Sequence, residues 1–193
     1  MKKSKRSKKS NTWKIKQHRD QFFKKSKTLG YRSRASFKLI ELNKKFKFIK
    51  ANSNLLDLGS SPGGWSQVAS QIITKGKIMS IDIKDMESVK NVKFIKRNLL
   101  EDKVQDEVKK YFESNLDIIL SDMAADTTGN KSLDSIRTNQ LCAQVINFSK
   151  KTLKPKGVLV SKLFMGEDFI EVKNLAKSLF KKVNFYKPES SRK

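Results

Sequence analysis

The sequence predicts an α/β fold in which helices cover both faces of a mostly parallel central sheet. Three observations support this prediction. Short apolar runs of strand length alternate along the chain with longer stretches of helical periodicity. The run Asp117–Ser121 is apolar nearly throughout, as expected of a strand that is buried on both faces. The run Leu55–Leu58 leads into a glycine-rich turn, the feature with which α/β proteins bind nucleoside-bearing cofactors.

The individual elements follow from the same apolar pattern. Strands are expected at Leu55–Leu58, Lys77–Ile83, Val92–Ile95, Asp117–Ser121, Val158–Phe164 and Lys182–Tyr186. Helices are expected over Arg34–Phe48, Trp65–Ile73, Leu100–Phe112, Leu133–Leu153 and Phe169–Leu179. A turn is expected at Pro155–Gly157, because Pro and Gly favour turns. No repeat or internal linker interrupts the alternation, which predicts a single domain.

The charge of the chain indicates a polyanionic partner. Lys and Arg number 43 against 19 acidic residues, so the formal net charge is +24, and a nucleic acid is the favoured partner. Residues 1–12 are mostly basic or Ser and are expected to form a disordered arm, with residues 13–193 forming the domain. No apolar stretch approaches the roughly 20 residues of a membrane-spanning helix, so no membrane association is expected.

Cysteine and histidine are too few for a metal site made by the protein alone. The chain holds one Cys, Cys142, and one His, His18, so neither a zinc site nor an internal disulfide is expected. A single free cysteine suits a reducing compartment, which favours the cytoplasm. We therefore expect no metal and a cytoplasmic protein.

The glycine-rich turn and the polar ends of the strands indicate a ligand site. The spacing of Gly59 and Gly63-Gly64 matches neither the dinucleotide G-x-G-x-x-G pattern nor a P-loop. The polar residues at the expected strand ends are Asp57, Asp82, Asn98, Asp122 and Lys162. Each alone is more simply a helix cap or turn residue, but together, at one edge of a parallel sheet, they favour a site. Asp82 is placed to accept hydrogen bonds from ribose hydroxyls, and Asn98 to contact an adenine edge.

Five segments carry a resemblance to a known family. They are Leu29–Leu39, Asp57–Gln67, Leu120–Ala124, Val160–Glu167 and Lys187–Arg192, in family order and at family-like distances. In these segments the chain resembles the FtsJ/RrmJ family of ribosomal RNA large-subunit 2′-O-ribose methyltransferases. The resemblance implies a Rossmann-like fold and S-adenosyl-L-methionine as the cofactor. It also implies methylation of a uridine ribose in 23S rRNA of the large ribosomal subunit. A monomer is expected, since nothing in the sequence indicates a larger assembly.

The resemblance also assigns roles to individual residues. It implies cofactor contacts at Gly63, Trp65, Asp82, Asn98 and Asp122, and catalysis by Lys38, Asp122 and Lys162. The chemistry is consistent with this assignment, because a ribose hydroxyl is a poor nucleophile that benefits from a base. A lysine serves as that base only when burial or a nearby cation lowers its pKa. Lys38 would lower the pKa of Lys162 and Asp122 would raise it, so the balance between them stays open.

The sequence departs from the family pattern at its carboxyl end. In the family, the Ser-Ser-Arg segment leads into a last strand that carries a catalytic glutamate, whereas the sequence ends at Lys193. No residue matches that glutamate, so either the sequence is truncated or the chain does without the last strand. In both cases we expect one sheet edge to be unpaired. Ala125 and Asp126 stand where the family usually has Pro and Asn, which could alter the loop over the methyl donor.

Contacts with RNA are expected at the amino-terminal end of the domain. Arg32 and Arg34 are candidates for bidentate phosphate contacts. The aromatic residues Trp13, Phe22, Phe23 and Tyr31 could stack on an unpaired base, although packing is the simpler interpretation for most of them.

Two other functions stay open at this point. One is a non-catalytic RNA-binding factor for ribosome assembly, and the other is a 2′-O-methyltransferase that acts on tRNA or on an mRNA cap. Cofactor affinity and methyl transfer would separate the first from an enzyme, and the identity of the RNA acceptor would decide the second.

Overall fold

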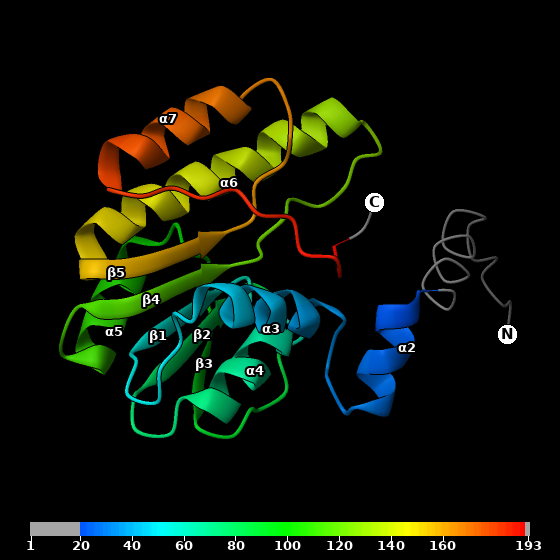
Figure 1. Ribbon diagram of the computed structural model, residues 1–193. Helices are drawn as coiled ribbons and strands as arrows, with labels where there is room; N and C mark the ends of the chain where they lie inside the picture. The colour runs from blue at the N-terminus through cyan, green and yellow to red at the C-terminus, as the bar shows by residue number, and fades with distance from the viewer. Residues whose placement is uncertain (1–19, 192–193) are drawn as a thin grey trace, which may run out of the picture.

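The computed structural model describes residues 20–191, which form a parallel five-stranded sheet with the strand order β3-β2-β1-β4-β5 (Figure 1). The strands are β1 (Leu55–Leu58), β2 (Ile78–Asp82), β3 (Val92–Lys96), β4 (Leu116–Ser121) and β5 (Leu153–Ser161). The α/β fold class and the first five expected strands are therefore confirmed. The basic arm, Trp13 and His18 lie outside the described residues, so the expectations about them stay predictions.

Helices cover both faces of the sheet, as the sequence predicts (Figure 1). They are α2 (Gln21–Thr28), α3 (Ala35–Phe46), α4 (Gly64–Ile72), α5 (Asp102–Phe112), α6 (Lys131–Thr152) and α7 (Phe169–Leu179). Helices α3 and α4 pack on one face, α5 and α6 pack on the other, and α7 packs against α6. None of the helices in residues 20–191 has the length and apolar character to cross a bilayer.

The alternating side chains of the central strands divide the core into two halves. In β1, Leu55 faces α3 and α4, whereas Leu56 and Leu58 face α5 and α6. All three are essentially inaccessible to solvent. Full burial of one such side chain contributes about 1.5–3 kcal/mol, so both helical layers are held firmly to the same short strand.

The turn expected at Pro155–Gly157 is present as an interruption within β5. Leu116 of β4 pairs with Leu153, but Ile118 pairs with Val158, so residues 154–157 are looped out of the ladder. Lys156 adopts a positive φ of 68° in this loop. β5 therefore starts earlier than predicted, and it ends at Ser161, which places Lys162 directly after the strand.

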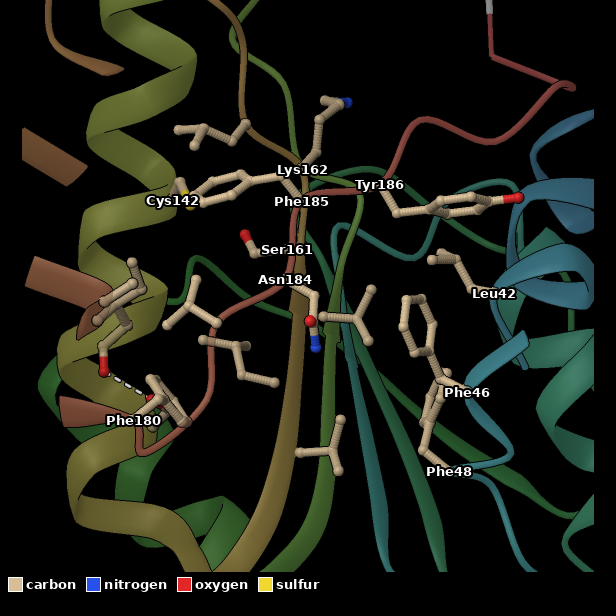
Figure 2. Close-up of a pocket in the computed structure, with 18 of the residues that line it drawn as sticks. Leu42, Phe46, Phe48, Cys142, Ser161, Lys162, Phe180, Asn184, Phe185 and Tyr186 are labelled. Carbon is tan, nitrogen blue, oxygen red and sulfur yellow. Dashed lines mark hydrogen bonds between the residues drawn. The ribbon is translucent and has the colours of Figure 1, made fainter. Parts of the chain in front are cut away.

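The sixth strand, expected at Lys182–Tyr186, is not formed, and this prediction was wrong. A strand requires a hydrogen-bonded neighbour, and no backbone hydrogen bond within residues 20–191 joins this segment to β5. A cavity of about 1800 Å³ is lined by both the segment and the edge of β5, with side chains of α3 on one side and α6 on the other (Figure 2). β5 is thus one of the two edge strands of the described sheet, and β3 is the other.

The carboxyl-terminal turn is held on α3 rather than on the sheet. The carboxylate of Glu41 accepts hydrogen bonds from the backbone N–H groups of Glu189 (2.7 Å) and Ser190 (3.2 Å). The guanidinium of Arg34 donates to the backbone carbonyl of Ser190 and pairs with Asp20, the N-cap residue of α2. The two ends of the described chain therefore meet on one helix.

We predict that Glu41→Ala releases the carboxyl-terminal turn. The backbone amides of Glu189 and Ser190 would lose their acceptor and exchange with deuterium at least about tenfold faster, because local opening sets the exchange rate. Hydrogen exchange followed by mass spectrometry or NMR measures this. Lys44→Ala, which removes an exposed side chain of the same helix, serves as the control. Equal protection in Glu41→Ala and the wild type would show that another contact holds the turn.

Candidate active site

Three side chains predicted to be catalytic meet at the carboxyl end of the sheet. Asp122 directly follows β4, Lys162 directly follows β5, and Lys38 reaches across from α3. The two carboxylate oxygens of Asp122 accept hydrogen bonds from Nζ of Lys38 at 3.1 and 3.0 Å. Nζ of Lys162 lies 3.1 Å from the same carboxylate and donates to the backbone carbonyl of Asp122 at 2.6 Å. One carboxylate therefore bridges two ammonium groups.

The surroundings of Lys162 favour its neutral form. About a fifth of each of the three side chains is exposed: 22% for Lys38, 20% for Asp122 and 21% for Lys162. Burial lowers the pKa of Lys162 below its ordinary value, Asp122 opposes that shift, and Lys38 adds to it. Burial is the largest of these causes, so the question left open by the sequence is decided mainly by desolvation rather than by Lys38.

The glycine-rich turn after β1 has no room for side chains at its second and third glycines. Gly63 adopts a φ of 105°, and a Cβ there would lie 2.9 Å from Nη1 of Arg32. A Cβ on Gly64 would lie 2.3 Å from Oγ of Ser33. The turn is thus packed against the segment that precedes α3, and glycine is required at both positions.

Asp82 connects the end of β2 to this turn. One oxygen of its carboxylate accepts from the backbone N–H of Ser61 at 2.8 Å, and the other accepts from the backbone N–H of Lys84 at 2.8 Å. Each carboxylate oxygen has two lone pairs, so capacity for ribose hydroxyls is left. Arg97, the residue before Asn98, donates its backbone N–H to the carbonyl of Asp82, which brings the end of β3 to the same place.

A small cavity of about 40 Å³ lies at the amino-terminal end of α4, lined by Gly64 and Asp122 among others. Oγ of Ser33 and Oγ of Ser60 are buried, border the cavity, and have no hydrogen-bond partner within the described part of the chain. The N–H groups at the start of a helix attract anions. These donors suit the carboxylate of the amino-acid end of S-adenosylmethionine, so the residues present fit the predicted cofactor.

Two of the predicted cofactor residues are placed differently from the others. The indole of Trp65 is 5% exposed, packs with Leu39 in the core and donates to the carbonyl of Ala35 at 2.8 Å. A cofactor contact from Trp65 would therefore come from its backbone. Asn98 is exposed, and its Oδ1 accepts from the backbone N–H of Leu100 at 3.1 Å. It acts as a turn residue in this structure, although the residue before it, Arg97, is hydrogen-bonded to Asp82.

Asp57 lies in β1, just before the glycine-rich turn in the sequence, and connects β1 to α4. It was not among the residues predicted to bind the cofactor. Its carboxylate is 1% exposed, and it accepts from Oγ of Ser66 in α4 at 2.6 Å. Ser66 in turn lies 2.7 Å from Oγ of Ser80 in β2. Burial is the main cause that raises the pKa of Asp57 to about 7, while the hydrogen bond from Ser66 opposes the rise. The sequence feature that could have identified this role is the position of Asp57 within the otherwise apolar run Leu55–Leu58.

The arginines predicted to contact phosphate form hydrogen bonds and ion pairs with other residues of the protein. Arg32 donates to backbone carbonyls near the glycine-rich turn, and Arg34 binds Asp20 and the carbonyl of Ser190. The rings of Phe22 and Tyr31 each lie 5.6 Å from the ring of Phe37, which supports the packing interpretation for both. Across residues 20–191, no group of three His, Cys, Asp or Glu side chains is arranged to hold a metal ion.

This combination of sheet order, turn and charged residues is characteristic of methyltransferases that use S-adenosylmethionine, with the cofactor at the carboxyl ends of β1 and β2. The sequence profile of one such family, described as FtsJ-like methyltransferase, matches residues 31–193. The chain belongs to this family. The family predicted from the sequence motifs is therefore confirmed, and with it the prediction of a methyltransferase.

Similar proteins extend over nearly the whole chain. The ribosomal RNA large subunit methyltransferase E of Pelagibacter ubique (strain HTCC1062) is 44% identical over 184 residues, which is 95% of this chain and 91% of the relative. The protein of the same name from Rickettsia akari (strain Hartford) is 40% identical and covers 97% of this chain and 86% of its own length. A crystal structure of a ribosomal RNA methyltransferase from Plasmodium falciparum matches with a TM-score of 0.76 and 34% identity, over 83% of this chain and 93% of that one.

We predict that Asp57 makes stability fall as the pH rises. Its pKa is about 7 in the folded protein against 3.8 for an ordinary Asp, so its contribution is fully present below pH 3.8 and is lost as the pH rises through about 7. The difference corresponds to roughly 4 kcal/mol at most. Urea unfolding between pH 5 and pH 8 should therefore show Asp57→Asn gaining stability relative to the wild type as the pH rises. A constant difference across that range would show that Asp57 is ionised in the folded state throughout.

Proposed function

We propose that the protein transfers the methyl group of S-adenosylmethionine to a ribose 2′-hydroxyl of large-subunit ribosomal RNA. The observation that carries this proposal is the sharing of the Asp122 carboxylate by Lys38 and Lys162 beside the glycine-rich turn. When bound, S-adenosylmethionine supplies an activated methyl group on a sulfonium centre. The residues of the chain then have to align the acceptor oxygen and remove its proton.

Lys162 is the residue best placed to accept the proton of the 2′-hydroxyl. Its lowered pKa provides a larger fraction of free amine at neutral pH than an ordinary lysine has. Asp122 holds the amine of Lys162 in place through its carboxylate and its backbone carbonyl. Lys38 shares that carboxylate and provides a positive charge next to the site. Alignment of the acceptor oxygen by such contacts can supply about 7–11 kcal/mol of the barrier reduction.

The substrate follows from the relatives and from the charge of the chain. Relatives named ribosomal RNA large subunit methyltransferase E cover more than nine tenths of this chain. A formal net charge of +24 favours binding to RNA phosphates. We infer that the acceptor is a uridine in 23S rRNA of the large ribosomal subunit, and that a monomer acts in the cytoplasm, where such subunits are assembled.

The alternative acceptors are less well supported. The names of the relatives favour ribosomal RNA over tRNA or an mRNA cap. Removing two ammonium groups and one carboxylate from water carries a desolvation cost. A non-catalytic assembly factor would not require this arrangement of Lys38, Asp122 and Lys162.

We predict that Lys162→Ala lowers single-turnover methyl transfer by roughly 10²–10⁴-fold, the usual contribution of a general base. The assay follows tritium from labelled S-adenosylmethionine into large ribosomal subunits isolated from a strain that lacks this methylation. Asp122→Ala should lose a comparable factor, because Lys162 loses the group that orients it.

Lys154→Ala provides a matched control for this experiment. Lys154 lies near the start of β5, whereas Lys162 directly follows its end, and Lys154 likewise pairs with an aspartate, Asp117 at 2.8 Å. The Lys154→Ala variant should methylate large ribosomal subunits at close to the wild-type rate. Near-normal transfer by Lys162→Ala would remove Lys162 from the mechanism. Tight binding of cofactor and subunits by the wild type without any transfer would favour the assembly factor.

The pH dependence of the rate separates a base from an orienting group. If Lys162 acts as the base, the single-turnover rate rises with pH and levels off below 10.5, the ordinary pKa of lysine. Lys162→Arg keeps the positive charge but does not deprotonate, so its rate should be low and nearly independent of pH. A rate in Lys162→Arg within about threefold of the wild type would show that the charge alone is sufficient.

A further inference from the structure

The side chain of Arg32 binds three backbone carbonyls that belong to two separate loops. Nη1 donates to the carbonyls of Glu87 (2.6 Å) and Pro62 (3.4 Å), and Nη2 donates to the carbonyl of Ser88 (2.5 Å). Pro62 lies in the glycine-rich turn after β1, whereas Glu87 and Ser88 lie in the loop after β2. One planar guanidinium therefore spans the two loops that border the predicted cofactor site.

The two loops have few other direct connections to each other. Ser61 donates its backbone N–H to Asp82 at 2.8 Å, and its Oγ donates to the carbonyl of Asp85 at 3.0 Å. Both contacts lie near the beginning of the loop after β2. Arg32 binds the far end of that loop, at Glu87 and Ser88, and so holds the part that the contacts from Ser61 do not reach.

The backbone of Arg32 is itself fixed to the helix that follows the glycine-rich turn. The N–H of Arg32 donates to Oε1 of Gln67 in α4 at 3.0 Å. Nε2 of the same Gln67 donates to the carbonyl of Gly30 at 2.9 Å. The backbone at Arg32 is therefore held by Gln67 of α4, and the side chain extends from there toward both loops.

The packing around the guanidinium is close. A Cβ on Gly63 would lie 2.9 Å from Nη1 and 3.0 Å from Cδ of Arg32, and 3.1 Å from Sδ of Met86. The arginine therefore occupies the space that the glycine leaves open. The neighbouring Ser33 directs its unpartnered Oγ to the small cavity at the start of α4. The segment that carries Arg32 is thus one wall of the same site.

We propose that Arg32 is a positioning residue for the methyl donor: it holds the loop after β2 against the glycine-rich turn, so that Asp82 and the start of α4 face the cofactor together. This inference rests on the proposed function of that site. It replaces the expectation that Arg32 binds an RNA phosphate, because both terminal nitrogens of its guanidinium donate to backbone carbonyls of the protein.

Lysine should not replace Arg32 in this role. The guanidinium offers several donors in a rigid planar fork, whereas the ammonium of lysine is a compact point charge. An ammonium would bind a carbonyl of one loop and leave the carbonyls of the other without a partner. If Arg32 instead contacted a phosphate, lysine would retain most of the interaction, so the conservative substitution separates the two roles.

The test compares Arg32→Met and Arg32→Lys with the wild type in two binding assays. Calorimetry measures the Kd for S-adenosylmethionine, and a salt titration measures binding to large ribosomal subunits. Lys24→Met is the matched control, because it removes one exposed positive charge from the neighbouring helix α2. Asp82→Ala tests the cofactor site itself. Thermal unfolding of every variant checks that it is folded.

Both Arg32 variants are expected to raise the Kd for S-adenosylmethionine by about tenfold or more, since several hydrogen bonds to a charged group are lost. The KM for the donor should rise while kcat at saturating donor stays within about threefold of the wild type, as expected for lost ground-state binding. Amides of residues 84–88 should exchange faster in both variants. Subunit binding should fall no further than in Lys24→Met.

Three results would overturn the inference in different ways. If Asp82→Ala weakens cofactor binding but Arg32→Met and Arg32→Lys do not, Arg32 has no positioning role, and the proposed site stands. A subunit affinity lost in Arg32→Met and kept in Arg32→Lys, with a salt slope reduced by about one, would identify a phosphate contact instead. If neither Asp82→Ala nor the Arg32 variants change the Kd, both the site and the inference are wrong.

Discussion

The carboxylate of Asp122 is the interaction on which the arrangement of the site depends. It accepts from Lys38 on α3 and from Lys162 after β5, so it connects a helix on one face of the sheet to the end of an edge strand. Two cations share one anion at a place where only about a fifth of each side chain is exposed. Burial lowers the pKa of Lys162, Asp122 opposes that shift, and the positive charge of Lys38 adds to it.

A second constraint comes from the absence of side chains at the glycine-rich turn. Each of its glycines leaves space for another residue of the protein: Met123 beside Gly59, Arg32 beside Gly63, and Ser33 beside Gly64. Glycine in such turns is usually explained by the close approach of a ligand. In this protein Gly63 and Gly64 also leave space for the segment before α3, which connects the helix that carries Lys38 to the predicted cofactor site.

The sequence was sufficient for features that depend on local pattern and insufficient for those that depend on distant partners. Apolar runs located the five strands of the described sheet, because burial requires such runs whatever surrounds them. The strand expected at Lys182–Tyr186 failed because pairing needs a neighbour that no local pattern reveals. Arg32 and Arg34 were interpreted as phosphate contacts, whereas in the structure their partners include backbone carbonyls. Every residue has a backbone carbonyl, so no sequence pattern points to these partners. Trp65 matched a family motif, yet its indole belongs to the core.

The free edge of β5 has a consequence for the behaviour of the protein at high concentration. Its first half carries Lys154, Pro155 and Lys156 in a looped-out stretch, and charge, proline and irregular backbone all oppose pairing with another chain. Its second half, Val158–Val160, is regular, apolar and open to the large cavity. Self-association through strand addition would therefore begin at Val158–Val160, where the backbone has no strand partner on the side away from β4 within the described sheet.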